Sequence, residues 1–200
     1  MNLKLLGVLA LAAASAASAD QNPASKACSV HVYPAEGVHS VGEDFDAVHG
    51  LDQDLHHYYA VAGRPLGWLS IDRQLELLAS LPLGQLAGAG TELPTLHNEP
   101  MSRSHALEPQ MRAAETGCAV EIYMPQIFLE RGGLSNRSLR IFGVARRYEQ
   151  GKLTHSFSGY AAAPLNGFQL RSPADAAAAT HLIEAAYVEA VKTFLHNSTK

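Results

Sequence analysis

Alternating apolar and polar residues predict a short strand near the start of the chain and a longer one past its middle. Residues 28–33 alternate and stop at Pro34, and a second alternating stretch begins at Cys118. In this second stretch the apolar positions change phase after Pro125. Because proline has no N–H to donate to a ladder, the change of phase indicates a bulge or an edge strand.

Two more strands are predicted directly after it. Residues 138–148 and 153–161 are rich in apolar residues, and Glu149-Gln150-Gly151-Lys152 lies between them. This tetrapeptide is typical of a tight hairpin, because Gly151 can adopt a positive φ without a steric penalty. The strand that begins at Cys118 and these two are therefore expected to form an antiparallel meander, with Ser156 and Ser158 on its polar, outer face.

Helical signals lie on both sides of the meander. Apolar residues at helical spacing predict a helix over 70–80, with Ser70 as its N-cap. The strongest signal is Ser172-Pro173-Ala174-Asp175, which combines an N-cap, a proline in the first turn and a capping acid. An apolar stripe continues this last helix to about Leu195.

Three other segments have weaker patterns. Residues 34–51 are rich in glycine and aspartate and predict a loop, and residues 52–62 predict one short helix. Residues 82–117 contain several prolines and glycines and are expected to be mostly irregular, with a helical turn near 108–114.

These elements together predict an α+β fold. The expected architecture is a two-layer sandwich in which an antiparallel-rich sheet, the front strand plus the three-strand meander, has helices on one face. Residues 20–200 are expected to be a single α+β globular domain, because their length suits one core.

The first 19 residues have the pattern of a cleavable, Sec-type signal peptide. A positive start is followed by an apolar stretch and by Ala17-Ser18-Ala19, which matches an A-x-A cleavage site. The apolar stretch is shorter than the ~20 residues that a membrane-spanning helix needs. We therefore expect a periplasmic or secreted protein that does not span the membrane, with an uncut membrane anchor as the alternative. Lipid anchoring is disfavoured, because Cys28 follows a polar spacer.

The sequence contains two cysteines, Cys28 and Cys118. An even pair in an oxidising compartment predicts a structural disulfide between them. The alternative, a catalytic thiol or a metal ligand, is less favoured because no Cys-x-x-Cys motif is present.

Charge is distributed unevenly along the chain. Residues 20–100 contain 11 acidic and 3 basic side chains, whereas residues 101–200 contain 8 acidic and 11 basic ones. The formal net charge of the whole chain is −4. Because nucleic-acid-binding domains normally have a basic excess, the balance argues against a nucleic-acid partner.

The acidic stretch 43–57 is a candidate metal site. On a helix over 52–62, Asp52 and His56 would lie four residues apart on one face, and His49 can approach them from the loop. Imidazole and carboxylate ligands suit Zn²⁺ or another first-row divalent ion. The alternative is a solvated acidic loop, since neither an EF-hand loop nor a His-Glu-x-x-His motif is present.

The strand over 138–148 is a candidate partner-binding surface. Alternation places Arg140, Phe142 and Arg146 on one face of it. Arginines interleaved with an aromatic ring on an open sheet face suit an acidic partner, either an envelope protein or a lipid head group. The alternative is that these arginines solubilise the face and pair with carboxylates of the acidic loop.

No catalytic residues are assigned, because the sequence contains no nucleophile elbow or other catalytic signature. The leading hypothesis is an exported periplasmic binding or accessory protein of the bacterial cell envelope that is not an enzyme. The second hypothesis is a metal-binding protein or metal-dependent enzyme that uses residues 43–57.

Overall fold

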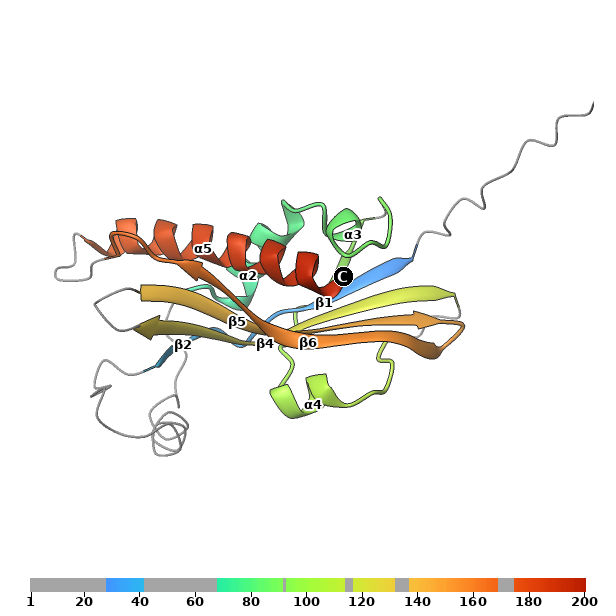
Figure 1. Cartoon of the computed structure of the whole chain (residues 1–200). Helices are drawn as coiled ribbons and strands as arrows, with labels where there is room; N and C mark the ends of the chain where they lie inside the picture. Colours follow the sequence, from blue (N-terminus) through green and yellow to red (C-terminus); the bar gives the residue numbers. More distant parts are fainter. Residues whose placement is uncertain (1–27, 42–67, 92, 114–116, 132–136, 169–174) are drawn as a thin grey trace, which may run out of the picture.

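A mixed β-sheet is the framework of the protein, and helices pack on both of its faces (Figure 1). The computed structural model describes residues 28–41, 68–91, 93–113, 117–131, 137–168 and 175–200. Its elements are, in chain order, β1 (Ser29–Tyr33), β2 (Val38–Val41), α2 (Ile71–Ala79), α3 (Leu83–Leu86), β3 (Thr95–Leu96), α4 (Arg103–Leu107), β4 (Cys118–Arg131), β5 (Arg137–Glu149), β6 (Lys152–Pro164) and α5 (Asp175–Ser198).

The strands lie in the order β3-β1-β4-β5-β6, and β2 also pairs with β4. Strands β4, β5 and β6 form the predicted antiparallel meander, and β1 is the predicted front strand. The pairing of β1 with β4 is parallel, so the sheet is mixed. The predicted α+β class is confirmed.

The bulge predicted at Pro125 is present, because the register of β4 against β5 shifts between Tyr123 and Gln126. On the other side of β4, β1 pairs with residues 119–123 and β2 pairs with residues 127–130. Two short parallel strands therefore follow one another along β4 and are separated at the bulge. The sequence pattern had predicted only a loop where β2 lies.

The β5–β6 hairpin also forms as predicted. Gln150 and Gly151 have φ values of 52° and 74°, which is the left-handed conformation that a tight two-residue hairpin requires at both central positions. The predicted glycine is therefore at a position where a positive φ is needed.

Helix α5 lies across one face of the sheet and buries its apolar stripe there (Figure 1). It continues to Ser198, about one turn beyond the predicted end near Leu195. Close packing against β5 depends on Gly143, since a Cβ at this position would lie 2.6 Å from ring carbons of Phe194. The ring of Phe194 fills the space that any other residue at position 143 would need.

We expect Gly143→Ala to destabilise the protein by about 1–3 kcal/mol, because a methyl group would overpack the contact between β5 and α5. Urea unfolding measures the effect. Gly117→Ala is the matched control, since a Cβ there has no neighbour within 4 Å and should change stability little. If both variants were equally stable, the proposed close packing of Phe194 on β5 would be wrong.

Helix α2 forms where the sequence predicts it, and the Ser70 side chain accepts a hydrogen bond from the Arg73 N–H. Gln74 of this helix is fully buried and bonds both the N–H and the carbonyl of Ala35. Arg73 bonds Glu184 of α5. These contacts hold α2 against the segment between β1 and β2 and against α5.

Helix α4 is a correction to the predicted architecture. A helical turn was expected near 108–114, and helices were expected on one face of the sheet. The helix lies at 103–107, on the face opposite α5 (Figure 1). Its N-cap is Ser102, whose side chain accepts a hydrogen bond from the His105 N–H. No helix in the described part of the chain is long and apolar enough to cross a membrane.

Candidate functional site

The sheet face opposite α5, here called the second face, contains the predicted partner-binding residues. Arg140, Phe142 and Arg146 are on this face, as alternation predicted. The expectation that the face is open is wrong for two of them, since Phe142 is 4% exposed and Arg146 is 3% exposed. Arg140 is partly exposed and pairs with Glu130 of β4 at 3.1 Å.

Residues 97–113 cover this part of the second face. Met101 and Ala106 pack against Phe142 and its aromatic neighbours, and the guanidinium of Arg103 lies 4.4 Å from the centre of the Phe142 ring. The covering segment has little periodic sequence pattern, so alternation within β5 alone could not predict that Phe142 is buried.

Glu121 is fully buried beneath this segment. One carboxylate oxygen accepts hydrogen bonds from the backbone N–H groups of Arg112 and Ala113, each at 2.7 Å. The other oxygen accepts a hydrogen bond from the Tyr123 hydroxyl. Burial, and then the bond to Glu121, raise the pKa of Tyr123, so the hydroxyl keeps its proton and donates. Glu121 therefore holds the chain after α4 against the sheet.

Arg146 is the residue directly opposite Glu121 in the register of β4 and β5. Directly opposed residues have their side chains on the same face, so this cross-strand pair places opposite charges side by side. The Arg146 guanidinium also lies 5.7 Å from the centre of the Tyr123 ring. The pair gives the buried carboxylate a nearby positive charge, which indicates a structural role for Arg146.

A row of stacked rings lies beside Glu121. His97 stacks on Tyr33 with centroids 4.1 Å apart, and Tyr33 stacks on Tyr123 at 4.8 Å. His31 Nδ1 lies 3.2 Å from His97 Nε2. Burial, and then the neighbouring His31, lower the pKa of His97, which favours a neutral ring in this packed position.

The part of the second face that lies on β6 is exposed. Its residues on β6 are Ser156, Ser158, Tyr160 and Ala162, and all four are exposed. The predicted outer position of Ser156 and Ser158 is therefore confirmed. The Tyr160 ring is 48% exposed, contacts the Phe142 ring at 5.1 Å, and lies 5.6 Å from the Arg140 guanidinium.

Strand β6 is also the last strand of the sheet. From Leu153 to Pro164 it contains no aspartate, glutamate, lysine or arginine. Natural edge strands are commonly protected from pairing by charged side chains, by bulges or by prolines along their length. Pro164 lies at one end of β6, and the register against β5 shifts near the other end, between Leu153 and His155. The part from His155 to Ala163 is therefore an edge without charged side chains, bulge or proline.

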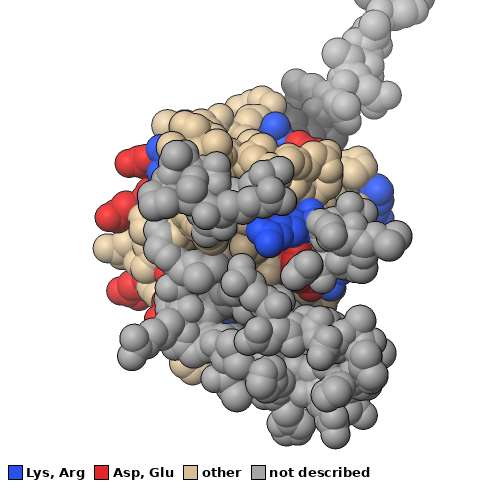
Figure 2. Space-filling view, turned by 90° about the vertical axis from the view of Figure 1, so that its left-hand side faces the viewer, with Lys and Arg blue, Asp and Glu red and all other residues tan. Residues whose placement is uncertain are grey.

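Charges are mixed at the end of the molecule where β4 ends and β5 begins. Figure 2 looks onto this end and shows Lys and Arg side chains near Asp and Glu side chains. Arg140 pairs with Glu130 here, and the Arg137 guanidinium lies over the Phe168 ring. Among the described residues in this view, both signs of charge are present.

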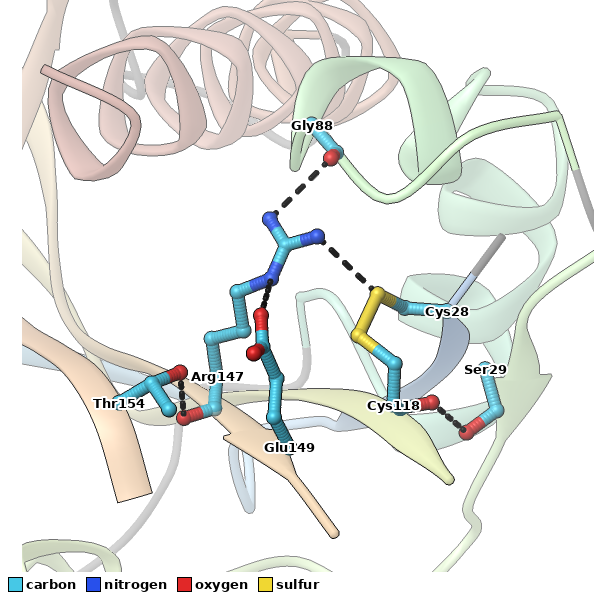
Figure 3. The surroundings of a disulfide bond; sticks show 7 residues. All are labelled: Cys28, Ser29, Gly88, Cys118, Arg147, Glu149 and Thr154. Carbon is cyan, nitrogen blue, oxygen red and sulfur yellow. Dashed lines mark hydrogen bonds and ion pairs between the residues drawn. A yellow bond between two sulfur atoms is a disulfide. The ribbon is translucent and has the colours of Figure 1, made fainter. Parts of the chain in front are cut away.

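The predicted disulfide is present and joins Cys28 to Cys118 across the starts of β1 and β4 (Figure 3). Arg147 lies beside it and donates hydrogen bonds to the Gly88 carbonyl and to the sulfur of Cys28. Glu149 lies 3.6 Å from Arg147 Nε. The bond therefore ties together the two parallel strands that the long connection over 34–117 separates.

The other predicted site residues lie outside the described part of the chain. These are the candidate metal ligands His49, Asp52 and His56, together with the signal peptide over 1–19. Within the described residues, no group of three or more His, Cys, Asp or Glu side chains could hold a metal ion. Metal binding by residues 43–57 stays a prediction.

The sequence-based search did not single out Glu121 or the edge of β6. For Glu121 a signal existed, since a glutamate between Val120 and Ile122 in a strand is on the face opposite those two residues. Its burial depends on residues 97–113 and could not be predicted from β4 itself. The exposed edge of β6 depends on the strand order, which local patterns do not determine.

No family model matches the sequence, and no curated protein is significantly similar to it. Similar solved structures include a Xanthomonas campestris protein described as family DUF330, with 10% identity and a TM-score of 0.44 over 85% of this chain and 80% of that one. A minor lipoprotein from Acinetobacter baumannii has 10% identity and a TM-score of 0.36, over 86% and 90% of the two chains. A hypothetical protein from Chlamydia trachomatis has 12% identity and a TM-score of 0.33, over 84% and 96%. Likenesses of this degree assign neither a family nor a function.

Proposed function

We propose that this protein is an exported accessory protein of the bacterial cell envelope, without catalytic activity, that binds an extended segment of a partner protein along β6. The observation that carries the proposal is the edge of β6. Thirteen residues form this edge strand, and after Lys152 none of them is Asp, Glu, Lys or Arg. Exposed edges of this length template pairing with another chain, because their outward N–H and carbonyl groups lack partners within the sheet.

The side chains next to this edge favour a particular kind of segment. A strand added to β6 would place alternate side chains on the second face, beside Tyr160 and Ser158. The Tyr160 ring is half-exposed and is supported from below by Phe142. An aromatic or aliphatic residue of the partner would pack on Tyr160, and small polar residues would suit the serine positions. Neither Arg140 nor Glu130 is left as an unpaired charge near this surface.

The disulfide supports export. Stable disulfides are typical of proteins outside the reducing cytoplasm. The signal peptide predicted over 1–19 indicates the same compartment. Since the chain has only two cysteines and both are in the bond, neither has a free thiol for attachment of a lipid. The protein would then reach the envelope as a soluble chain and stay there through its partner.

Photo-crosslinking in living bacteria tests the proposal. A photoreactive phenylalanine analogue at position 160 should crosslink to a single envelope protein, because an aromatic or aliphatic side chain of the bound segment would lie against it. The matched control is the same analogue at Lys192, which is exposed on α5, on the other side of the sheet. Position 192 should give no crosslink to that protein.

A second variant separates strand pairing from simple proximity. Ser158→Lys places a charge on the exposed edge strand, which is how natural edges prevent pairing. It should abolish the crosslink from position 160 without changing the thermal stability of the protein. Equal crosslinking from positions 160 and 192, or crosslinking only to a second copy of this chain, would contradict the proposal.

A further inference from the structure

A cavity of about 420 Å³ lies beside the disulfide, between the end of α5, the segment after α3 and the helix-covered face of the sheet. Its lining includes Arg146 of β5 and His155 of β6, but neither Ser158 nor Tyr160. Its volume is within the range of small-molecule sites in proteins, about 300–1,000 Å³. Figure 3 shows the Arg147 guanidinium beside the disulfide and directed towards Gly88, and both Arg147 and Gly88 line the cavity.

The basic residues that line the cavity are Arg146 and Arg147 of β5, His155 of β6 and Lys200, which follows α5. No aspartate or glutamate is among the described residues that line it. Glu149 lies 3.6 Å from Arg147 Nε, so one carboxylate partly offsets the arginine from outside the lining. Basic side chains still outnumber acidic ones around the cavity, which favours a ligand with a negative charge.

Two of these side chains are held in position before any ligand binds. Arg147 donates to the Gly88 carbonyl at 3.4 Å and to the Cys28 sulfur at 3.1 Å. His155 Nε2 lies 3.0 Å from the Ser198 carbonyl, and because a carbonyl can only accept, Nε2 carries the hydrogen. Side chains fixed by such bonds lose little conformational freedom when they bind an anion.

The other side of the cavity is apolar. It is lined by Ala87, Val120 and Ala145, which are all buried members of the core beneath α5. A hydrated inorganic anion would leave this surface in contact with water. A ligand with an apolar chain would cover it and gain roughly 0.8 kcal/mol for each CH₂ that it buries.

We infer that this cavity is a binding site for a small amphipathic carboxylate, with the carboxylate towards Arg147 and His155 and a short apolar chain over Ala87, Val120 and Ala145. The inference is independent of the proposed strand binding along β6. It would survive the failure of that proposal, since strand pairing uses the outward backbone edge of β6 and Tyr160, whereas the cavity uses only the His155 side chain of that strand.

Titration with octanoate, followed by amide NMR shifts and calorimetry, tests the inference. Octanoate should shift the amide signals of residues 87–88, 145–147 and 198–200. Octan-1-ol, which lacks the charge, and acetate, which lacks the chain, should each bind at least tenfold more weakly. Raising the salt concentration should weaken octanoate binding, because the charges at the rim are partly solvated.

Two substitutions at the cavity have a matched control outside it. His155→Gln keeps a donor for the Ser198 carbonyl but removes the imidazole, and Lys200→Gln removes the lysine charge without altering the core. Each should weaken octanoate binding about 2- to 10-fold, as expected for a partly exposed charge. Lys192→Gln, on the exposed side of α5, should leave the affinity unchanged.

Four outcomes would overturn the inference. Octanol or acetate could bind as tightly as octanoate, the shifts could cluster away from the cavity, or Lys192→Gln could weaken binding as much as His155→Gln. A failure of octanoate to bind at millimolar concentration would overturn it as well.

Discussion

Replacing Glu121 with leucine is expected to destabilise the protein by about 3–5 kcal/mol, the range found when one partner of a buried charged network is removed. The carboxylate accepts hydrogen bonds from two backbone N–H groups and from the Tyr123 hydroxyl. The variant would leave these donors without their acceptor and would remove the carboxylate opposite the buried Arg146. Urea unfolding at neutral pH measures the loss.

The loss of hydrogen-exchange protection should be greatest in residues 97–113, which cover the second face. The bonds to Arg112 and Ala113 hold the chain after α4 on the second face, so hydrogen exchange there should rise more than in α5. Glu189→Leu is the matched control, since Glu189 is exposed on α5 and should change stability by no more than about 0.5 kcal/mol. A loss below 1 kcal/mol for Glu121→Leu would show that the network is not a main support of this face.

The second large effect is expected from the double variant Cys28→Ala/Cys118→Ala. The disulfide joins residues 90 positions apart, and in the chain-entropy model a loop of this length contributes about 4–5 kcal/mol by restricting the unfolded state. Since β1 and β4 are parallel and far apart in the sequence, little local structure helps to bring them together. We expect a loss of about 3–5 kcal/mol in urea unfolding.

A reductant provides the internal control for this prediction. Dithiothreitol should destabilise the natural protein by a similar amount and leave the double variant unchanged. Two free thiols per chain in the denatured, unreduced protein would contradict the bond itself. An equal response of both proteins to the reductant would show that the effect comes from somewhere other than the bond.

The elements that could be predicted are those with strong local signals. Alternation and a hairpin glycine predicted the meander, and Ser70 predicted the start of α2. These signals act between residues close in sequence, so a single chain displays them. The disulfide was predictable for another reason, because only one pairing of two cysteines exists.

The elements that were missed depend on distant parts of the chain. Strand β2 has four residues and forms because β4 offers its edge beyond the bulge at Pro125. No helical turn forms over 108–113, where the N–H groups of Arg112 and Ala113 bond Glu121 rather than helix carbonyls. Both results follow from tertiary contacts that override local preference.

The same division applies to the candidate site. Alternation placed Arg140, Phe142 and Arg146 on one face, but the cover over two of them comes from a segment without periodic pattern. The partner-binding surface that we propose therefore lies at the edge of β6, where Tyr160 is exposed, and not in the middle of β5.

Hydrogen exchange of β6 tests the central claim most directly. The exchange rates are compared between the free protein and its complex with the protein that the photoreactive residue at position 160 identifies. Since β5 pairs with only one side of β6, alternate amides between residues 153 and 163 face outward in the free protein. If a strand is added, these amides should exchange at least tenfold more slowly in the complex, while the exchange rates of the α5 amides should not change. Unchanged exchange in β6, with new protection on α5 or elsewhere, would contradict the account.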